Sequence, residues 1–145
     1  MALTALWTHG NAVVPESPQQ LVKFTRFGFG TDVKSAQNVP TMWFHAPMPT
    51  PPFLNGQRPK LRRVILLGKS GDVSSAIRRV HIFDGNDRVQ DKSVLIGGDN
   101  LNFNEECVVQ TGSQPIFKGL GITMFLDASS GSFSYFFAAF GADWE

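Results

Sequence analysis

The chain contains the run Gly121-Ile122-Thr123-Met124-Phe125-Leu126-Asp127, then Ala128-Ser129-Ser130-Gly131-Ser132, then Phe133-Ser134-Tyr135-Phe136-Phe137-Ala138-Ala139-Phe140. In the first run, large apolar residues recur at every second position, which is the period of a β-strand with one buried face. The middle run is rich in residues that favour turns. The last run becomes apolar at successive positions, which is typical of a strand covered on both faces. We therefore predict strands over 118–127 and 133–140, joined as a hairpin, with the second strand inside a sheet or forming half of an interface.

A similar pattern occurs in the middle of the chain. Two runs rich in Val, Ile and Leu, at 61–67 and 76–83, flank the turn-forming stretch 68–72. This arrangement predicts a second hairpin with a longer loop. Weaker strand patterns occur at 3–9, 20–27, 41–46 and 106–110.

Helix signals are scarce along the whole chain. The 14 glycines and 9 prolines are spread through the sequence and bracket short apolar runs, as expected for many strands joined by turns. About ten short strands predict two packed layers, because one open sheet of that size would leave an apolar face in water. We predict an all-β fold, a two-layer antiparallel β-sandwich of jelly-roll or Greek-key type, formed by residues 1–145 as a single domain. The Pro-rich segment 47–53 is predicted to be an edge, a loop or a short polyproline segment.

The composition limits the classes of protein. With 145 residues, 42% of them apolar and 17% charged, the chain has the size and composition of one globular domain. Its 13 basic and 12 acidic residues nearly cancel, so no broad positive field would attract nucleic acid. Residues 1–7 lack the features of a signal peptide, and no stretch reaches the roughly 20 apolar residues of a membrane span. We expect a cytoplasmic protein, and export without a cleavable signal stays open.

Two tryptophans precede histidines at the same spacing, in Trp7-x-His9 and Trp43-x-His45, and the third histidine is His81. Residues two apart in a strand face the same side, so each pair would place an indole beside an imidazole. The simplest interpretation puts each Trp in the core, with its His hydrogen-bonded at the rim. In a second interpretation the Trp rings stack on a sugar and the histidines supply hydrogen bonds. A third is a metal-dependent enzyme of cupin type with all three histidines around the metal, although the His-x-His pair usual for such sites is missing.

Side chains with oxygen ligands gather after one of the predicted strands, at Asp84, Asn86, Asp87 and Asp91. Carboxylate and amide oxygens are the ligands that calcium prefers. Arg88 stands where a further oxygen ligand would be expected in a helix-flanked calcium loop, and no helices are predicted beside it. An ordinary turn explains the same residues, because Asp and Asn are frequent in turns. A calcium-dependent sugar binder therefore stays open beside the plain turn.

Three short motifs carry a family resemblance. They are Leu6-Trp7-Thr8-His9-Gly10-Asn11, Trp43-Phe44-His45 followed by Pro49-Thr50-Pro51, and Val80-His81-Ile82-Phe83-Asp84-Gly85. Together they resemble the signature of a small bacterial family of stand-alone domains of about this length and of unknown function. The resemblance implies that these tryptophans and histidines belong to a shared framework, and it brings no activity or cofactor.

The aromatic content favours a role in binding. Aromatic residues make up 12% of the chain, and the sequence contains no nucleotide-binding, hydrolase or metalloprotease motif. The leading hypothesis is a non-enzymatic β-sandwich that binds a carbohydrate-like ligand or self-assembles as a homo-oligomer. The predicted ligand-binding residues are Trp7, His9, Trp43, His45 and His81.

Overall fold

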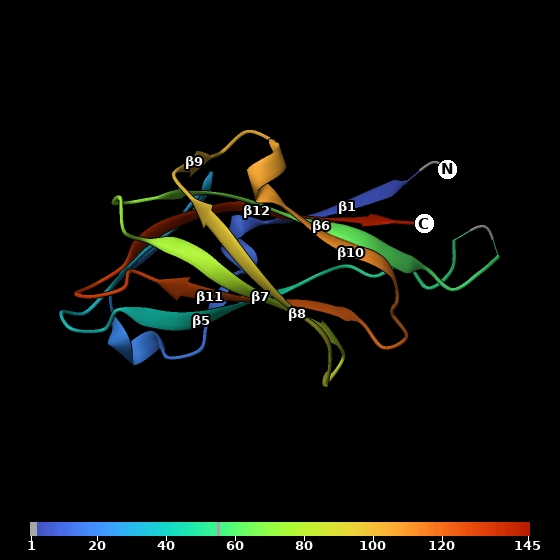
Figure 1. Ribbon diagram of the computed structural model, residues 1–145, viewed down its shortest axis with the longest axis horizontal. Helices are drawn as coiled ribbons and strands as arrows, with labels where there is room; N and C mark the ends of the chain where they lie inside the picture. Colours follow the sequence, from blue (N-terminus) through green and yellow to red (C-terminus); the bar gives the residue numbers. More distant parts are fainter. Residues whose placement is uncertain (1–2, 55) are drawn as a thin grey trace.

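The computed structural model describes residues 3–54 and 56–145 and shows two β-sheets packed face to face (Figure 1). The seven-stranded sheet contains β1 (Thr4–His9), β3 (Leu21–Phe27), β4 (Gly30–Ser35), β6 (Lys60–Ser70), β9 (Asp99–Asn100), β10 (Val108–Pro115) and β12 (Ser134–Trp144). The five-stranded sheet contains β2 (Val14–Pro15), β5 (Thr41–Pro47), β7 (Ala76–Asp84), β8 (Asp87–Gly97) and β11 (Leu120–Asp127). Among the described residues, helical structure is confined to the 3-10 turns η1 (Gly10–Ala12), η2 (Pro18–Gln20) and η3 (Glu105–Cys107).

The order of the strands defines a jelly roll. Eight strands form its two layers, β4-β12-β6-β10 in one sheet and β5-β11-β7-β8 in the other, and neighbouring strands run antiparallel. Between β4 and β12, each of these eight strands is followed along the chain by a strand of the other sheet. The exception is β7, which is followed by β8 in the same sheet. This is the topology of a jelly-roll sandwich. The predicted two-layer antiparallel β-sandwich of jelly-roll type is confirmed.

Both predicted hairpins are wrong, although the strands themselves are present. Strands β6 and β7 lie in different sheets, and so do β11 and β12, so 68–72 and 128–132 lie in arches between the layers. Alternation in a sequence shows that a strand has one buried face, but it does not show which of the two layers the strand joins. The hairpins that do form are β3–β4 and β7–β8.

Asp72 organises the arch between β6 and β7. Its Oδ1 accepts the backbone N–H of Ser74 at 3.0 Å and of Ser75 at 2.8 Å, and both serine hydroxyls at 2.9 Å. Burial acts to raise the pKa of Asp72, but the hydrogen bonds from Ser75 and Ser74 outweigh it and hold the pKa below its usual value. The Ser75 Oγ also accepts the backbone N–H of Ser134, at 3.0 Å, which ties the arch to the start of β12.

The core lies between the two sheets and is built from every second residue of the central strands. Strand β5 contributes Met42, Phe44 and Ala46, and β11 contributes Ile122, Met124 and Leu126, all of them buried. The Phe44 ring packs on Phe133 at 5.9 Å and on Phe137 at 5.1 Å between ring centroids. The alternate residues of β5 and β11 therefore point to the outer face of the five-stranded sheet.

Strand β12 is a central strand, as its apolar sequence predicts. It pairs with β6 on one side and with β4 and β1 on the other. Its outward residues are covered from within the chain, because the ring of Phe29 packs on Phe136 at 5.6 Å and the indole of Trp7 lies against Gly141.

No helix among the described residues is long and apolar enough to cross a membrane. The cytoplasmic location stays a prediction. In the Pro-rich segment, Pro47 closes β5 and residues 48–53 form no strand.

Candidate ligand-binding groove

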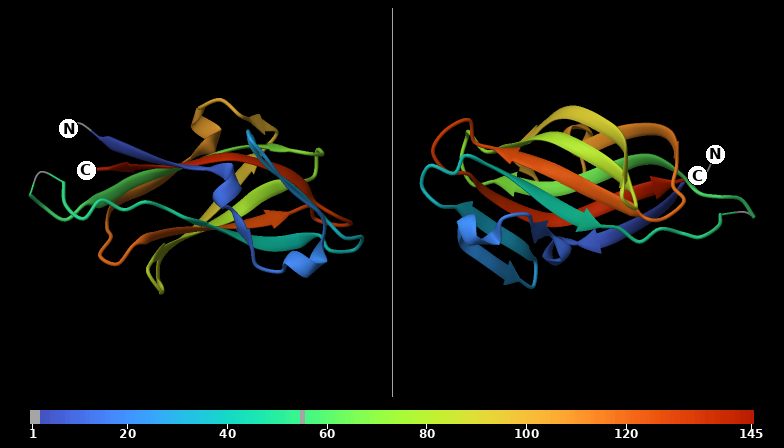
Figure 2. Two further views of the ribbon diagram at one scale, coloured as in Figure 1. Left: turned by 180° about the vertical axis from the view of Figure 1, so that it is seen from behind. Right: turned by 90° about the horizontal axis from the view of Figure 1, so that it is seen from below.

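The outer face of the five-stranded sheet brings together three of the predicted binding residues. In the antiparallel register His45 of β5 lies opposite Thr123 of β11, and Thr123 lies opposite His81 of β7. Trp43 lies two residues before His45 on β5, opposite Phe125 of β11. Cross-strand partners share a face of the sheet, so these side chains form two adjacent rows on the face seen in Figure 2, right.

A third row on this face has a gap in its centre, at Gly121. This glycine lies between Pro47 on β5 and Phe83 on β7, and the missing side chain leaves a groove of about 370 Å³ between its neighbours. The groove is also lined by His45 and Thr123 and by residues 85–86 of the β7–β8 turn. Its volume is within the range of small-molecule sites, and its lining of apolar walls with a few polar groups is typical of them.

Local packing does not require a glycine at the floor of the groove. A Cβ at Gly121 would have only the Cβ of Phe83 within 4 Å, at an ordinary contact distance of 3.6 Å. The open floor is therefore a feature of the surface that a side chain could fill.

The polar lining of the groove centres on His45. Its Nδ1 is hydrogen-bonded to the Thr123 hydroxyl at 3.0 Å. Its Nε2 lies 3.9 Å from the Glu16 carboxylate, which is too long for a hydrogen bond. The imidazole is thus fixed on one side by the neighbouring strand, while its other nitrogen and the exposed carboxylate are available to a ligand.

Next to the groove, Trp43 and His81 form an aromatic contact. Their ring centroids are 4.6 Å apart, and the indole also packs on Phe125 at 4.8 Å. The His81 Nε2 lies 3.4 Å from Asp91 Oδ1, and the same oxygen forms an ion pair with Arg79, whose Nε lies 3.1 Å away. Burial lowers the pKa of His81 and outweighs the opposing charge of Asp91. The imidazole of His81 is therefore harder to protonate than a free histidine side chain.

The other predicted binding pair lies on the opposite side of the sandwich. Trp7 and His9 are in β1, in the seven-stranded sheet. The His9 Nδ1 accepts the backbone N–H of Asn11 at 3.0 Å, so its Nε2–H donates to the Gly28 carbonyl, also at 3.0 Å. The histidine therefore joins β1 to the β3–β4 turn. Trp7 covers Gly141 and is 47% exposed.

The three histidines do not converge on one point. His9 lies on a different sheet from His45 and His81, and Thr123 separates the latter two in the register. Residues 3–54 and 56–145 contain no cluster of three or more His, Cys, Asp or Glu side chains placed to hold a metal ion. The arrangement expected for a cupin-type metal site is absent from the described part of the chain.

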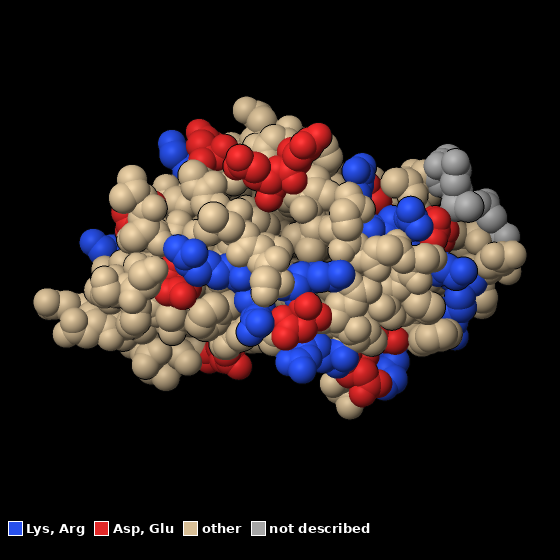
Figure 3. Space-filling view, in the orientation of Figure 1, with Lys and Arg blue, Asp and Glu red and all other residues tan. Residues whose placement is uncertain are grey.

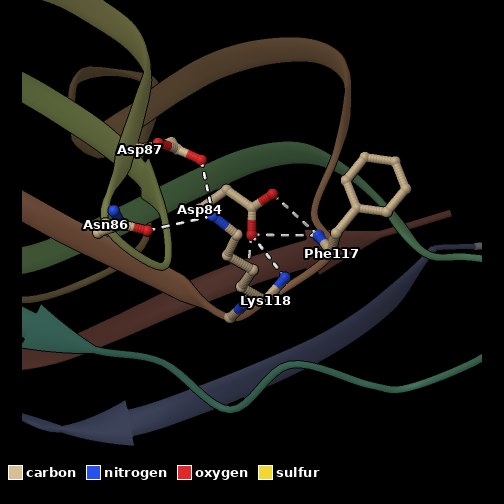
Figure 4. A network of polar contacts seen from close by, with 6 residues as sticks. Asp84, Asn86, Asp87, Phe117 and Lys118 are labelled. Carbon is tan, nitrogen blue, oxygen red and sulfur yellow. Dashed lines mark hydrogen bonds and ion pairs between the residues drawn. The ribbon is translucent and has the colours of Figure 1, made fainter.

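The predicted calcium residues have protein partners instead (Figure 4). Asp84 accepts the backbone N–H groups of residues 117–119, at 2.7–3.3 Å. The Lys118 ammonium donates to Asn86 Oδ1 at 3.1 Å and to Asp87 Oδ2 at 2.8 Å. Asp91 lies further along β8 and pairs with Arg79. These contacts tie the β7–β8 turn to the β10–β11 connection, and they account for the residues without a metal. Calcium binding by these residues stays an untested alternative to the plain turn.

Burial acts to raise the pKa of Asp84, but the backbone N–H groups of Lys118, Phe117 and Gly119 outweigh it. The pKa of Asp84 is therefore held below its usual value.

Several groove residues were not predicted as site residues. They include Pro47, Phe83, Gly121 and Thr123. Phe83 stands two positions after His81 and so shares its face of β7, which is a signal that the sequence contains. Gly121 and Thr123 join the site only through the register of β11 between β5 and β7.

Together, the fold and the groove define a jelly-roll β-sandwich with a small ligand-sized site on one sheet face. No protein-family model and no curated protein matches the sequence. Among solved structures, the chain is similar to TmCBM61 in complex with β-1,4-galactotriose, with a TM-score of 0.49, 12% identity and coverage of 93% of this chain and 86% of that one. It is also similar to the exo-β-1,3-galactanase of Phanerochaete chrysosporium, with a TM-score of 0.32, 13% identity and coverage of 98% and 29%. Similarity at this level carries no functional argument.

Proposed function

We propose that this protein is a non-catalytic binding module that holds a carbohydrate ligand in the groove over Gly121. The observation that carries the proposal is the open floor at Gly121 between the Phe83 and Pro47 walls, with polar side chains at both ends. A sugar ring combines apolar C–H faces with hydroxyl groups at its rim. Flat apolar walls with hydrogen-bonding groups at the ends complement that shape.

The two ends of the groove offer different hydrogen bonds. At one end, His45 Nε2 and the Glu16 carboxylate lie 3.9 Å apart, and a ligand hydroxyl can donate to the carboxylate. At the other end, Asn86 Oδ1 accepts from Lys118, so the amide N–H groups of Asn86 are available to donate. Hydroxyl groups can serve as both donor and acceptor, so a saccharide can satisfy both ends.

The variant Gly121→Val tests the proposal by filling the floor of the groove without removing a contact. We expect the wild-type protein to bind at least one immobilised oligosaccharide on a glycan array. By isothermal titration the variant should bind that saccharide at least about tenfold more weakly, a loss of about 1.4 kcal/mol. The melting temperature should not fall, because valine is favoured over glycine in a strand.

Thr25→Val is the control, since it places a valine at a partly exposed position on β3 of the other sheet. Equal affinity of Gly121→Val and wild type would contradict the assignment of the groove. An array on which no saccharide binds would contradict the proposed carbohydrate ligand.

Self-association as a homo-oligomer is a second candidate, supported by aromatic side chains at the β3–β4 turn. Phe29 is 68% exposed and stacks on Phe27, with 5.0 Å between the centroids of the nearly parallel rings. Exposed aromatic clusters mark interaction sites. Sedimentation velocity should show a complex in the wild type that Phe29→Ser dissociates, and a wild-type monomer at all concentrations would contradict this candidate.

A further inference from the structure

The rim of the groove on the β8 side carries an excess of positive charge. Phe83, which forms a wall of the groove, lies opposite Arg88 in the register of β7 and β8. Two residues before Phe83, His81 lies opposite Asp91. Two residues before His81, Arg79 lies opposite Ser93. Cross-strand partners share a face, so Arg79 and Arg88 lie on the same outer face as the groove.

One carboxylate faces these two arginines. Asp91 forms an ion pair with Arg79, with 3.1 Å between Oδ1 and Nε, and also contacts His81. In the part of the chain that the structure describes, no carboxylate pairs with the Arg88 guanidinium, since the nearby Asp87 pairs with Lys118 at 2.8 Å. Lys and Arg side chains gather over β7 and β8 in the space-filling view (Figure 3). Among the described residues, the Arg88 guanidinium therefore has no ion-pair partner, and it lies beside the groove wall formed by Phe83.

We propose that the groove selects an acidic saccharide, whose uronic-acid carboxylate binds the Arg88 guanidinium while the sugar ring packs between Phe83 and Pro47. This inference rests on the proposed carbohydrate-binding function and adds the class of sugar. The planar guanidinium matches a carboxylate through two parallel hydrogen bonds. A neutral sugar would leave this interaction unused.

The opposite rim fixes the orientation of such a ligand. Glu16 lies beside His45 at the β5 side of the groove, with its side chain about half exposed. Its negative charge repels a carboxylate, whereas Arg88 attracts one. The acidic group therefore points toward β8, and the hydroxyl edge of the ring points toward Glu16 and His45.

The test compares acidic oligosaccharides with their neutral methyl esters. The probes are oligogalacturonate, oligoglucuronate and oligomannuronate, each titrated calorimetrically in acid and in ester form. We expect at least one acid to bind about fivefold or more tightly than its ester, the scale of one partly exposed ion pair. The preference should weaken as salt is added, because the pair is accessible to solvent.

Variants of Arg88 assign the preference to one side chain. Arg88→Gln should bind the acid and the ester equally, and Arg88→Lys should restore part of the preference, since it keeps the charge but not the planar fork. Lys34→Gln removes the same charge from an exposed position on β4 of the other sheet and should bind like the wild type.

The outcomes separate this inference from the proposed function. If neutral sugars bind, Gly121→Val weakens their binding about tenfold or more and no acid is preferred over its ester, the acidic-sugar inference is wrong and the carbohydrate function stands. An acid preference that survives in Arg88→Gln would also overturn the inference. If neither acids nor neutral sugars bind, both proposals fail.

Discussion

Asp84 shows how much structure one side chain can organise. Its carboxylate accepts three consecutive backbone N–H groups from residues 117–119, and the residue is 6% exposed. Asp84→Asn keeps the shape, but it replaces one acceptor oxygen with an amide donor that faces backbone donors. We expect the free energy of unfolding to fall by about 1–3 kcal/mol, the cost of leaving buried hydrogen-bonding groups unsatisfied. Urea denaturation followed by tryptophan fluorescence measures this loss.

Asp87→Asn is the control for this residue. Asp87 pairs with Lys118 in the same cluster, but both side chains are more than half exposed, at 64% and 53%. Exposed ion pairs contribute little, so we expect a change within about 0.5 kcal/mol. Equal losses in the two variants would show that the backbone contacts of Asp84 do not stabilise the turn.

Strands were predictable from this sequence, but their partners were not. The periods of two at 61–67, 76–83 and 118–127 identified strands, yet the links between them fit a hairpin and an arch equally well. The consequence for the site is direct, because Trp7-x-His9 and Trp43-x-His45 have the same local pattern and lie on opposite sheets. A sequence gives the face of each strand, whereas the groove depends on the register between strands that are far apart in the chain.

The β7–β8 hairpin provides a prediction about calcium. Its turn is held by Asp84, Asn86 and Asp87 through backbone N–H groups and the Lys118 ammonium, so protein donors already satisfy oxygens that a metal ion would use. We expect the thermal unfolding midpoint to be the same in calcium and in chelator, since only a ligand that binds the native state would raise it. A higher midpoint in calcium that is lost in Asp87→Asn would instead show that the turn binds the ion.

The sandwich as a whole carries three groups that resist protonation. The pKa values of Asp72, Asp84 and His81 all lie below their ordinary values, 3.8 for the two carboxyls and 6.5 for the imidazole. For each group the unfolded chain binds protons more readily than the native protein. The free energy of unfolding must therefore fall as the pH falls.

The loss should occur in two stages. The contribution of His81 is fully present above its ordinary pKa of 6.5 and is lost as the pH falls through the lower native value. The contributions of Asp72 and Asp84 persist until the pH falls below 3.8. Urea unfolding at a series of pH values resolves both stages, and His81→Gln should remove the upper one alone, because it deletes the titrating ring and leaves both aspartates in place. If the variant and the wild type lost stability equally between neutral pH and pH 5, His81 between Trp43 and Asp91 would not be the group that titrates.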